Sequence, residues 1–142
     1  VKDPSCRTAR ACCVNNDPQF RVAYTGLVNL HPTIGELNAA RSNFAYAILA
    51  GEAREYGDCD FEVEQSNDLV EPGEDVRGDV SRIYFHMEAK YDLSYPDPWN
   101  ELLVEWDAED PISDKEIARN ERIRAAQGSS NEFVLIVEDQ SD

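Results

Sequence analysis

Apolar and polar residues alternate with two different periods along the chain, which predicts a mixture of helices and strands. Between residues 33 and 57, apolar side chains recur every three to four positions and so share one face of a helix. Thr33 and Glu36 form a capping box at its start, and Gly51 or Gly57 would end it. This segment is predicted to be the principal helix.

Alternation with a period of two predicts strands at residues 61–64 and 83–89. In the second run, Ile83, Phe85 and Met87 would point to one side of the sheet. Turn-forming residues bound these runs and would join neighbouring strands by short loops. Further strands are predicted at residues 19–24 and 102–106, and turns at 71–75 and 95–98.

The last thirty residues predict a second helix and a final strand. Ser113 and Glu116 form another capping box, and Gly128 is a natural helix end. The apolar run at residues 133–137 is continuous enough for a strand buried on both faces. The predicted fold class is therefore α+β, with one main helix packed on a mostly antiparallel sheet and an additional C-terminal helix and strand.

The length of 142 residues suits one domain, which at this size buries roughly two-thirds of its unfolded surface. We expect a Cys- and Asn-rich N-terminal segment at residues 1–18 and a single α+β domain at 19–142. Within it, residues 26–106 would form the core and 107–142 a helix-strand extension. No apolar run approaches the roughly 20 residues that span a bilayer, so no membrane segment is expected.

The chain is strongly acidic, with 29 acidic and 13 basic residues and a formal net charge of -16. Such a charge repels phosphate backbones, whose binding depends on basic groups. The composition therefore argues against a nucleic-acid partner. It leaves open a protein partner, including a basic one.

Four cysteines occur, and their spacing matches no zinc-binding pattern. Neither a metal site nor another cofactor is expected. The even number allows two disulfides, one of which would join Cys59 to the N-terminal cluster, but free thiols fit equally well. The compartment, intracellular or secreted, stays open. The cysteines are Cys6, Cys12, Cys13 and Cys59.

Three short segments, in this order, resemble the cystatin family, especially its plant members. Gly26 precedes the principal helix, residues 74–78 read Glu-Asp-Val-Arg-Gly where cystatins carry Gln-x-Val-x-Gly, and Pro98-Trp99 matches their second loop. The resemblance covers about residues 26–106. It implies a non-enzymatic inhibitor that wedges an N-terminal segment and two hairpin loops into the cleft of a papain-like cysteine protease. The implied contact residues are Gly26, Glu74, Val76, Arg77, Gly78, Pro98 and Trp99.

Two alternatives remain beside the inhibitor. The first is a divergent cystatin-like module that recognises another protein without inhibiting a protease. The second, more remote, is a metal-dependent nuclease in which Glu88 and Lys90 share one face of a strand, the lysine orienting an attacking water. Of the two histidines, His31 and His86, neither stands in a recognisable catalytic motif.

Overall fold

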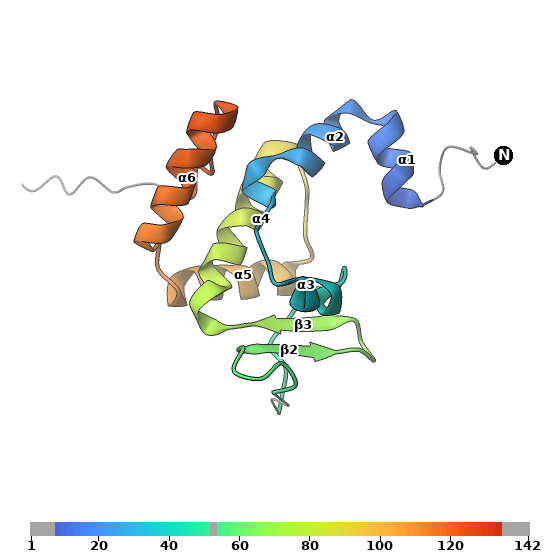
Figure 1. Ribbon diagram of the computed structural model, residues 1–142, viewed down its shortest axis with the longest axis vertical. Coiled ribbons are helices and arrows are strands. Elements are labelled where there is room, and N and C mark those ends of the chain that lie inside the picture. The colour runs from blue at the N-terminus through green and yellow to red at the C-terminus, as the bar shows by residue number, and fades with distance from the viewer. Residues whose placement is uncertain (1–7, 52–53, 135–142) are drawn as a thin grey trace, which may run out of the picture.

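The computed structural model describes residues 8–51 and 54–134, which form a small sheet with helices around it (Figure 1). Helix α4 runs through the middle of the fold, with the sheet at one end and α6 along one side. The elements are α1 (Ala9–Asn16), α2 (Pro18–Thr25), η1 (Leu27–Asn29), α3 (Gly35–Arg41), β1 (Ala45–Tyr46), β2 (Phe61–Glu64), β3 (Leu69–Pro72), η2 (Glu74–Val76), α4 (Arg77–Tyr91), α5 (Asp97–Glu109) and α6 (Asp114–Gln127).

The sheet has the strand order β1-β3-β2. β2 and β3 form an antiparallel hairpin in which Val63 pairs with Val70, and β1 lies parallel to β3. Asp68 has a φ of 56° in the hairpin loop, a conformation that Asp tolerates better than most residues. Val70 is fully buried under the helices, so the sheet closes one end of the core.

The α+β class is confirmed, but several predicted elements are wrong. In place of the predicted principal helix the structure has the seven-residue helix α3. Ser42 caps its C-terminus with a φ of 51°, and strand β1 follows. The strand at 19–24 lies in α2, and the strand at 102–106 lies in α5. The sheet combines one parallel and one antiparallel pairing. The described residues therefore do not form the predicted cystatin-like arrangement of one main helix on a mostly antiparallel sheet.

The predicted strand at residues 83–89 is the middle of helix α4. Val80, Ile83, Tyr84 and Met87 recur at helical spacing and face the same cleft. At the start of this helix Gly78 packs against α5, where its N–H donates to Asp110 Oδ2 at 2.9 Å and a Cβ would collide with the Asp110 carbonyl. Gly78 is therefore needed for close helix packing, not for a hairpin turn.

Helix α6 confirms the second predicted helix. Ser113 Oγ accepts from the backbone N–H of Glu116, whose carboxylate accepts from the N–H of Ser113, and Gly128 ends the helix with a φ of 79°. Beyond it Phe133 and Val134 lie in a turn. The rest of the strand predicted at 133–137 falls outside the described residues.

A buried arginine joins the three long helices. Arg82 of α4 is 2% exposed, and its Nε and Nη2 donate to the two carboxylate oxygens of Glu116 in α6 at 2.9 and 2.7 Å. Its Nη1 donates to Asp107 Oδ1 at 2.8 Å and to the Asp110 carbonyl at 2.9 Å, both at the end of α5. Because the Glu116 side chain is also buried, removal of either residue would leave the other as an unpaired buried charge.

Cys12 takes part in a disulfide bond, whereas Cys13 and Cys59 are free thiols. A disulfide from Cys59 to the N-terminal cluster is therefore not formed. Within residues 8–51 and 54–134, no helix is long and apolar enough to cross a membrane.

Candidate functional site

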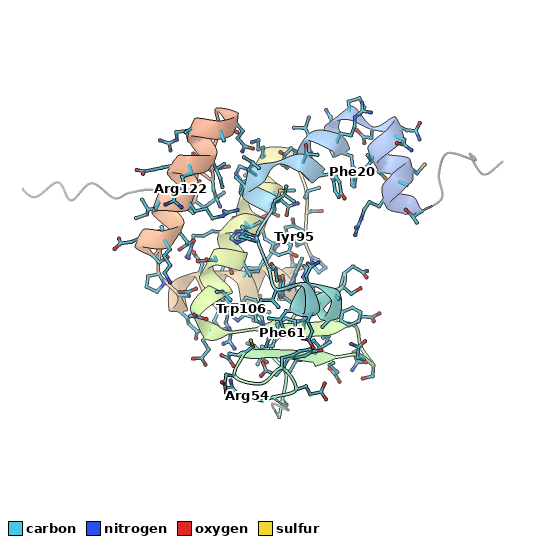
Figure 2. All side chains as sticks on the ribbon, viewed as in Figure 1. Phe20, Arg54, Phe61, Tyr95, Trp106 and Arg122 are labelled. Atoms are coloured by element: carbon cyan, nitrogen blue, oxygen red, sulfur yellow. The ribbon has the colours of Figure 1, made fainter. Side chains whose placement is uncertain are left out.

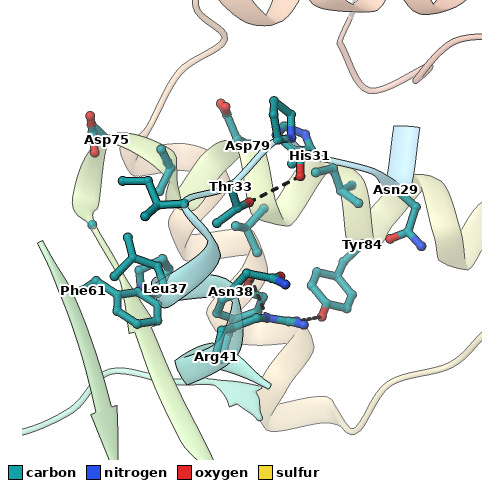
Figure 3. Close-up of a pocket in the computed structure, with 18 of the residues that line it drawn as sticks. Asn29, His31, Thr33, Leu37, Asn38, Arg41, Phe61, Asp75, Asp79 and Tyr84 are labelled. Carbon is teal, nitrogen blue, oxygen red and sulfur yellow. Dashed lines mark hydrogen bonds between the residues drawn. The ribbon is translucent and has the colours of Figure 1, made fainter. Parts of the chain in front are cut away.

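A cleft of about 730 Å³ separates residues 29–41 from the sheet and from one face of α4 (Figure 3). Its walls are largely apolar, with Ile83 and Met87 from α4, Leu37 from α3 and Phe61 from β2. Polar side chains surround these walls: Asn29, His31, Asn38, Arg41, Asp75, Asp79 and Tyr84. An apolar cleft with a few convergent polar groups is the usual form of a substrate site.

Helix α6 fixes the backbone at one end of the cleft. Arg119 Nη2 donates to the carbonyls of Leu27 and Leu30, each at 2.9 Å, and makes a longer contact of 3.4 Å with that of Val28. Two turns later in α6, Gln127 Oε1 accepts from the Leu27 N–H at 3.0 Å. Both anchors hold the short helix η1, so the side chain of Asn29 projects from a rigid turn.

Asn29 is exposed, and its side-chain amide makes no hydrogen bond within the part of the chain that the structure describes. Figure 3 shows Asn29 and His31 at one end of the cleft, with Phe61 and Asp75 at the other. An amide that is free on a backbone held by two side chains is available to a bound molecule.

His31 keeps contact with solvent, but desolvation by its neighbours and the charge of Arg119 lower its pKa to about 4, against the opposing charge of Glu116. The imidazole is therefore neutral at pH 7. A neutral ring can accept a proton or a hydrogen bond, which an imidazolium cannot.

Arg41 supplies the positive charge in the cleft. Its Nε donates to Tyr46 Oη at 3.2 Å, Nη2 approaches Tyr84 Oη at 3.5 Å, and its guanidinium carbon lies 4.8 Å from the centre of the Tyr46 ring. Desolvation raises the pKa of Tyr84 even though Arg41 opposes the shift, so the Tyr84 hydroxyl is a neutral acceptor here. Arg41 has no carboxylate partner among the described residues, and its charge is available to an anion.

Asp79 lies where the cleft meets the buried Arg82 network. Withdrawal from solvent, then the charge of Glu116 and a hydrogen bond with it, raise the pKa of Asp79 to about 7, while Arg82 opposes the shift. Arg82 binds Glu116 and Asp107 at short range and reaches Asp79 only at 3.4 Å. One guanidinium cannot neutralise three carboxylates, so Asp79 keeps its proton up to about pH 7.

The raised pKa of Asp79 predicts a fall in stability with rising pH. The folded chain keeps this proton up to about pH 7, whereas the unfolded chain releases it near 3.8, so the folded state binds more protons between these values. We expect Asp79→Asn to flatten the decline in unfolding free energy between pH 5 and pH 8, measured by urea denaturation. Asp75→Asn, at the exposed rim, is the control; an unchanged decline in Asp79→Asn would refute this assignment.

No group of three or more His, Cys, Asp or Glu residues within residues 8–51 and 54–134 is arranged to hold a metal ion.

A comparison with protein families identifies the chain. The model of the endonuclease I family matches residues 11–138, which include the cleft and every element from α2 to α6. The chain belongs to the endonuclease I family.

Proteins similar to this chain support this assignment. Endonuclease-1 of Buchnera aphidicola (from Acyrthosiphon pisum) is 34% identical over 83% of this chain and 47% of the relative. An extracellular deoxyribonuclease of Aeromonas hydrophila is 36% identical over 88% of this chain and 54% of the relative. An extracellular ribonuclease of Bacillus subtilis is 32% identical over 78% of this chain and 43% of the relative. The chain thus spans about half the length of these relatives.

The endonuclease I match overturns the functional predictions. The cystatin resemblance is wrong, and with it the protease inhibitor, the inactive cystatin-like module and the plant assignment, since these relatives are bacterial. The expectation of a non-enzyme is also wrong, because the relatives are named endonuclease, deoxyribonuclease and ribonuclease. Their names equally contradict the prediction against a nucleic-acid partner.

The residues predicted to form the wedge do not meet at one end of the fold. Gly26 lies near the Tyr91 hydroxyl at the end of α4, whereas Gly78 lies at its start, about 20 Å away along the axis. Glu74 and Val76 lie in η2, Arg77 and Gly78 begin α4, Gly26 links α2 to η1, and Pro98 and Trp99 lie in the first turn of α5.

Several of these residues have contacts within the protein. Arg77 pairs with Glu71 at 2.6 Å, and Trp99 Nε1 donates to the Tyr46 carbonyl at 3.0 Å. Residues 74–78 and 98–99 therefore do not form the two predicted hairpin loops, since they lie in η2, α4 and α5. Contact of the exposed Glu74 and Val76 with a partner stays a prediction.

The nuclease alternative agrees with the names of the relatives, but the geometry on which it was based is wrong. Glu88 and Lys90 lie on α4, where residues two positions apart point about 200° from each other. They do not share a face as they would on a strand. Asn29, Arg41 and Arg119 were not predicted, and no local signal could have linked Arg119 to Leu27, because 92 positions separate them.

Proposed function

We propose that this chain is part of a nuclease that cleaves phosphodiester bonds of DNA or RNA, with the cleft beside residues 29–41 as its substrate site. The observation that carries the proposal is the endonuclease I match over residues 11–138, which contain every residue of that cleft. Because the chain spans about half of its relatives, their complete activity is part of the proposal.

The cleft supplies groups that suit this substrate. The guanidinium of Arg41 would bind a phosphate oxygen, a contact for which its planar donors are well shaped. The amide of Asn29 would hydrogen-bond to the same phosphodiester, and the neutral ring of His31 would accept a hydrogen bond or a proton. The apolar walls and the Tyr84 ring would lie against sugar or base.

We also propose that the protein acts outside the cytoplasm. Relatives are named extracellular and periplasmic deoxyribonuclease. The disulfide bond at Cys12 supports this placement, because disulfides persist in oxidising compartments.

The test is direct: the purified chain is incubated with supercoiled plasmid and with end-labelled RNA in a buffer containing Mg²⁺, and binding of both polymers is followed by fluorescence anisotropy. We expect nicked and linear plasmid or shortened RNA to accumulate in proportion to protein, and Arg41→Ala to reduce binding. Arg54→Ala, which removes an exposed arginine paired with Asp60, is the control. A chain that neither binds nor cuts either polymer would refute the proposal.

A further inference from the structure

A basic stripe lies along α6, formed by Lys115, Arg119 and Arg122. Residues at positions i, i+4 and i+7 of a helix fall within an arc of about 60°. Figure 1 shows α6 at the edge of the molecule, and Figure 2 marks Arg122 on it. The alanines next to the stripe, Ala118, Ala125 and Ala126, are small enough to let another chain approach the helix closely.

We propose that this basic stripe binds the phosphate backbone of the nucleic acid that enters the cleft; this inference rests on the proposed nuclease function. Helix α6 carries four of the chain's 13 basic residues and three acidic ones, Asp114, Glu116 and Glu121. The three cations of the stripe share one face, and Asp114 and Glu121 lie about 80–100° around the helix axis from it, so positive charge is concentrated on that face. Nucleic-acid binding depends on such local groups rather than on net charge.

The basic side chains of the stripe form no ion pair with another described residue. Within the described residues, Lys115 and Arg122 have no carboxylate partner, whereas Glu116 on the same helix points inward to Arg82. Arg119 donates from Nη2 to the carbonyls of Leu27 and Leu30, and it lies between the other two cations along the helix. Glu116 thus does not neutralise the stripe.

The stripe also leads to the proposed substrate site. Lys115 and Arg119 line a hollow of about 180 Å³ together with His31 and Pro32, and these two residues line the main cleft as well. Lys115 and Arg122 are about 10 Å apart along the helix axis, which matches about three phosphates of one strand at 3.4 Å each. A strand bound along α6 would therefore continue past His31 toward Arg41.

The experiment measures binding of a fluorescent oligonucleotide to this chain between 50 and 300 mM NaCl. Each phosphate contact contributes about 0.7 to 0.9 to the slope of log K against log salt, so the double variant Lys115→Ala, Arg122→Ala should lower the slope by about 1.5 and weaken binding at low salt. The control, Arg10→Ala with Lys90→Ala, removes the same charge from exposed sites outside α6 and should leave the slope unchanged.

The outcomes separate the stripe from the nuclease. If the wild-type chain binds and both double variants lose the same slope, the stripe is only part of a general charge effect and this inference is wrong, while the proposed function stands. If the wild-type chain binds no nucleic acid, both fail. Thermal melting of the variants, which replace exposed side chains, should match that of the wild type.

Discussion

Replacing Arg82 with alanine is expected to lower the free energy of unfolding by about 3–5 kcal/mol, the cost of breaking a buried ion pair by removing one partner. The guanidinium is 2% exposed and makes two hydrogen bonds to Glu116. Its loss would leave the Glu116 carboxylate, 8% exposed, without its cation and would disconnect α4 from α6. Urea denaturation followed by circular dichroism measures the change.

Two further variants test the reason for this loss. Arg124→Ala removes an exposed arginine whose side chain, among the residues that the structure describes, bonds only Ser130 Oγ, and we expect a change within about 0.5 kcal/mol. The double variant Arg82→Met, Glu116→Gln removes both charges and should recover part of the stability, since the remaining amide can still cap α6. A loss below about 1 kcal/mol in Arg82→Ala would show that the network is not a main support of the fold.

The elements that the sequence predicted correctly are those with local, side-chain-encoded ends. The capping box of Ser113 and Glu116 and the following Gly128 define α6 without help from the rest of the fold. The alternation of apolar and acidic residues at 61–64 similarly identifies β2, although Glu62 is buried beside Phe61 in the structure. Such signals depend on neighbours in the sequence, so they can be read from it.

Helix α4 was missed because it is packed on more than one side. Ile83 and Met87 face the cleft, whereas Phe85 lies against Phe133 with ring centres 5.6 Å apart, and His86 is 2% exposed. Apolar residues on opposite faces of a central helix imitate the two-residue period of a strand. Only the longer pattern that includes Val80 favours the helical period.

The nature of the site was equally hidden from composition. A net charge of -16 argued against nucleic acid, yet part of the acidity is directed inward, as in the pairs Glu71 with Arg77 and Glu116 with Arg82. The groups that shape the cleft come from η1, α3, α4 and α6, and they meet only after folding. Such long-range contacts have no signature in local spacing.

Replacing Asn29 with alanine is expected to reduce the rate of nucleic-acid cleavage by about 10²-fold, the usual cost of removing one preorganised polar contact from an active site. The backbone of η1 would stay in place, because Arg119 and Gln127 hold it through main-chain atoms. Asn29 is exposed, so the unfolding free energy should change by no more than about 0.5 kcal/mol. Initial rates of plasmid nicking at saturating and limiting substrate measure the effect.

The control Asn43→Ala removes an exposed asparagine outside the cleft lining and should retain the wild-type rate. Asn29→Asp then separates the two halves of the amide, since the carboxylate keeps an oxygen acceptor and loses the N–H donors. Recovery of activity in Asn29→Asp would show that the amide oxygen makes the required contact. Continued loss would show that the N–H groups make it, by donating to a phosphate. A rate in Asn29→Ala above half that of wild type would show that Asn29 is not part of the site, because the loss would lie far below the roughly 10²-fold that one preorganised contact contributes.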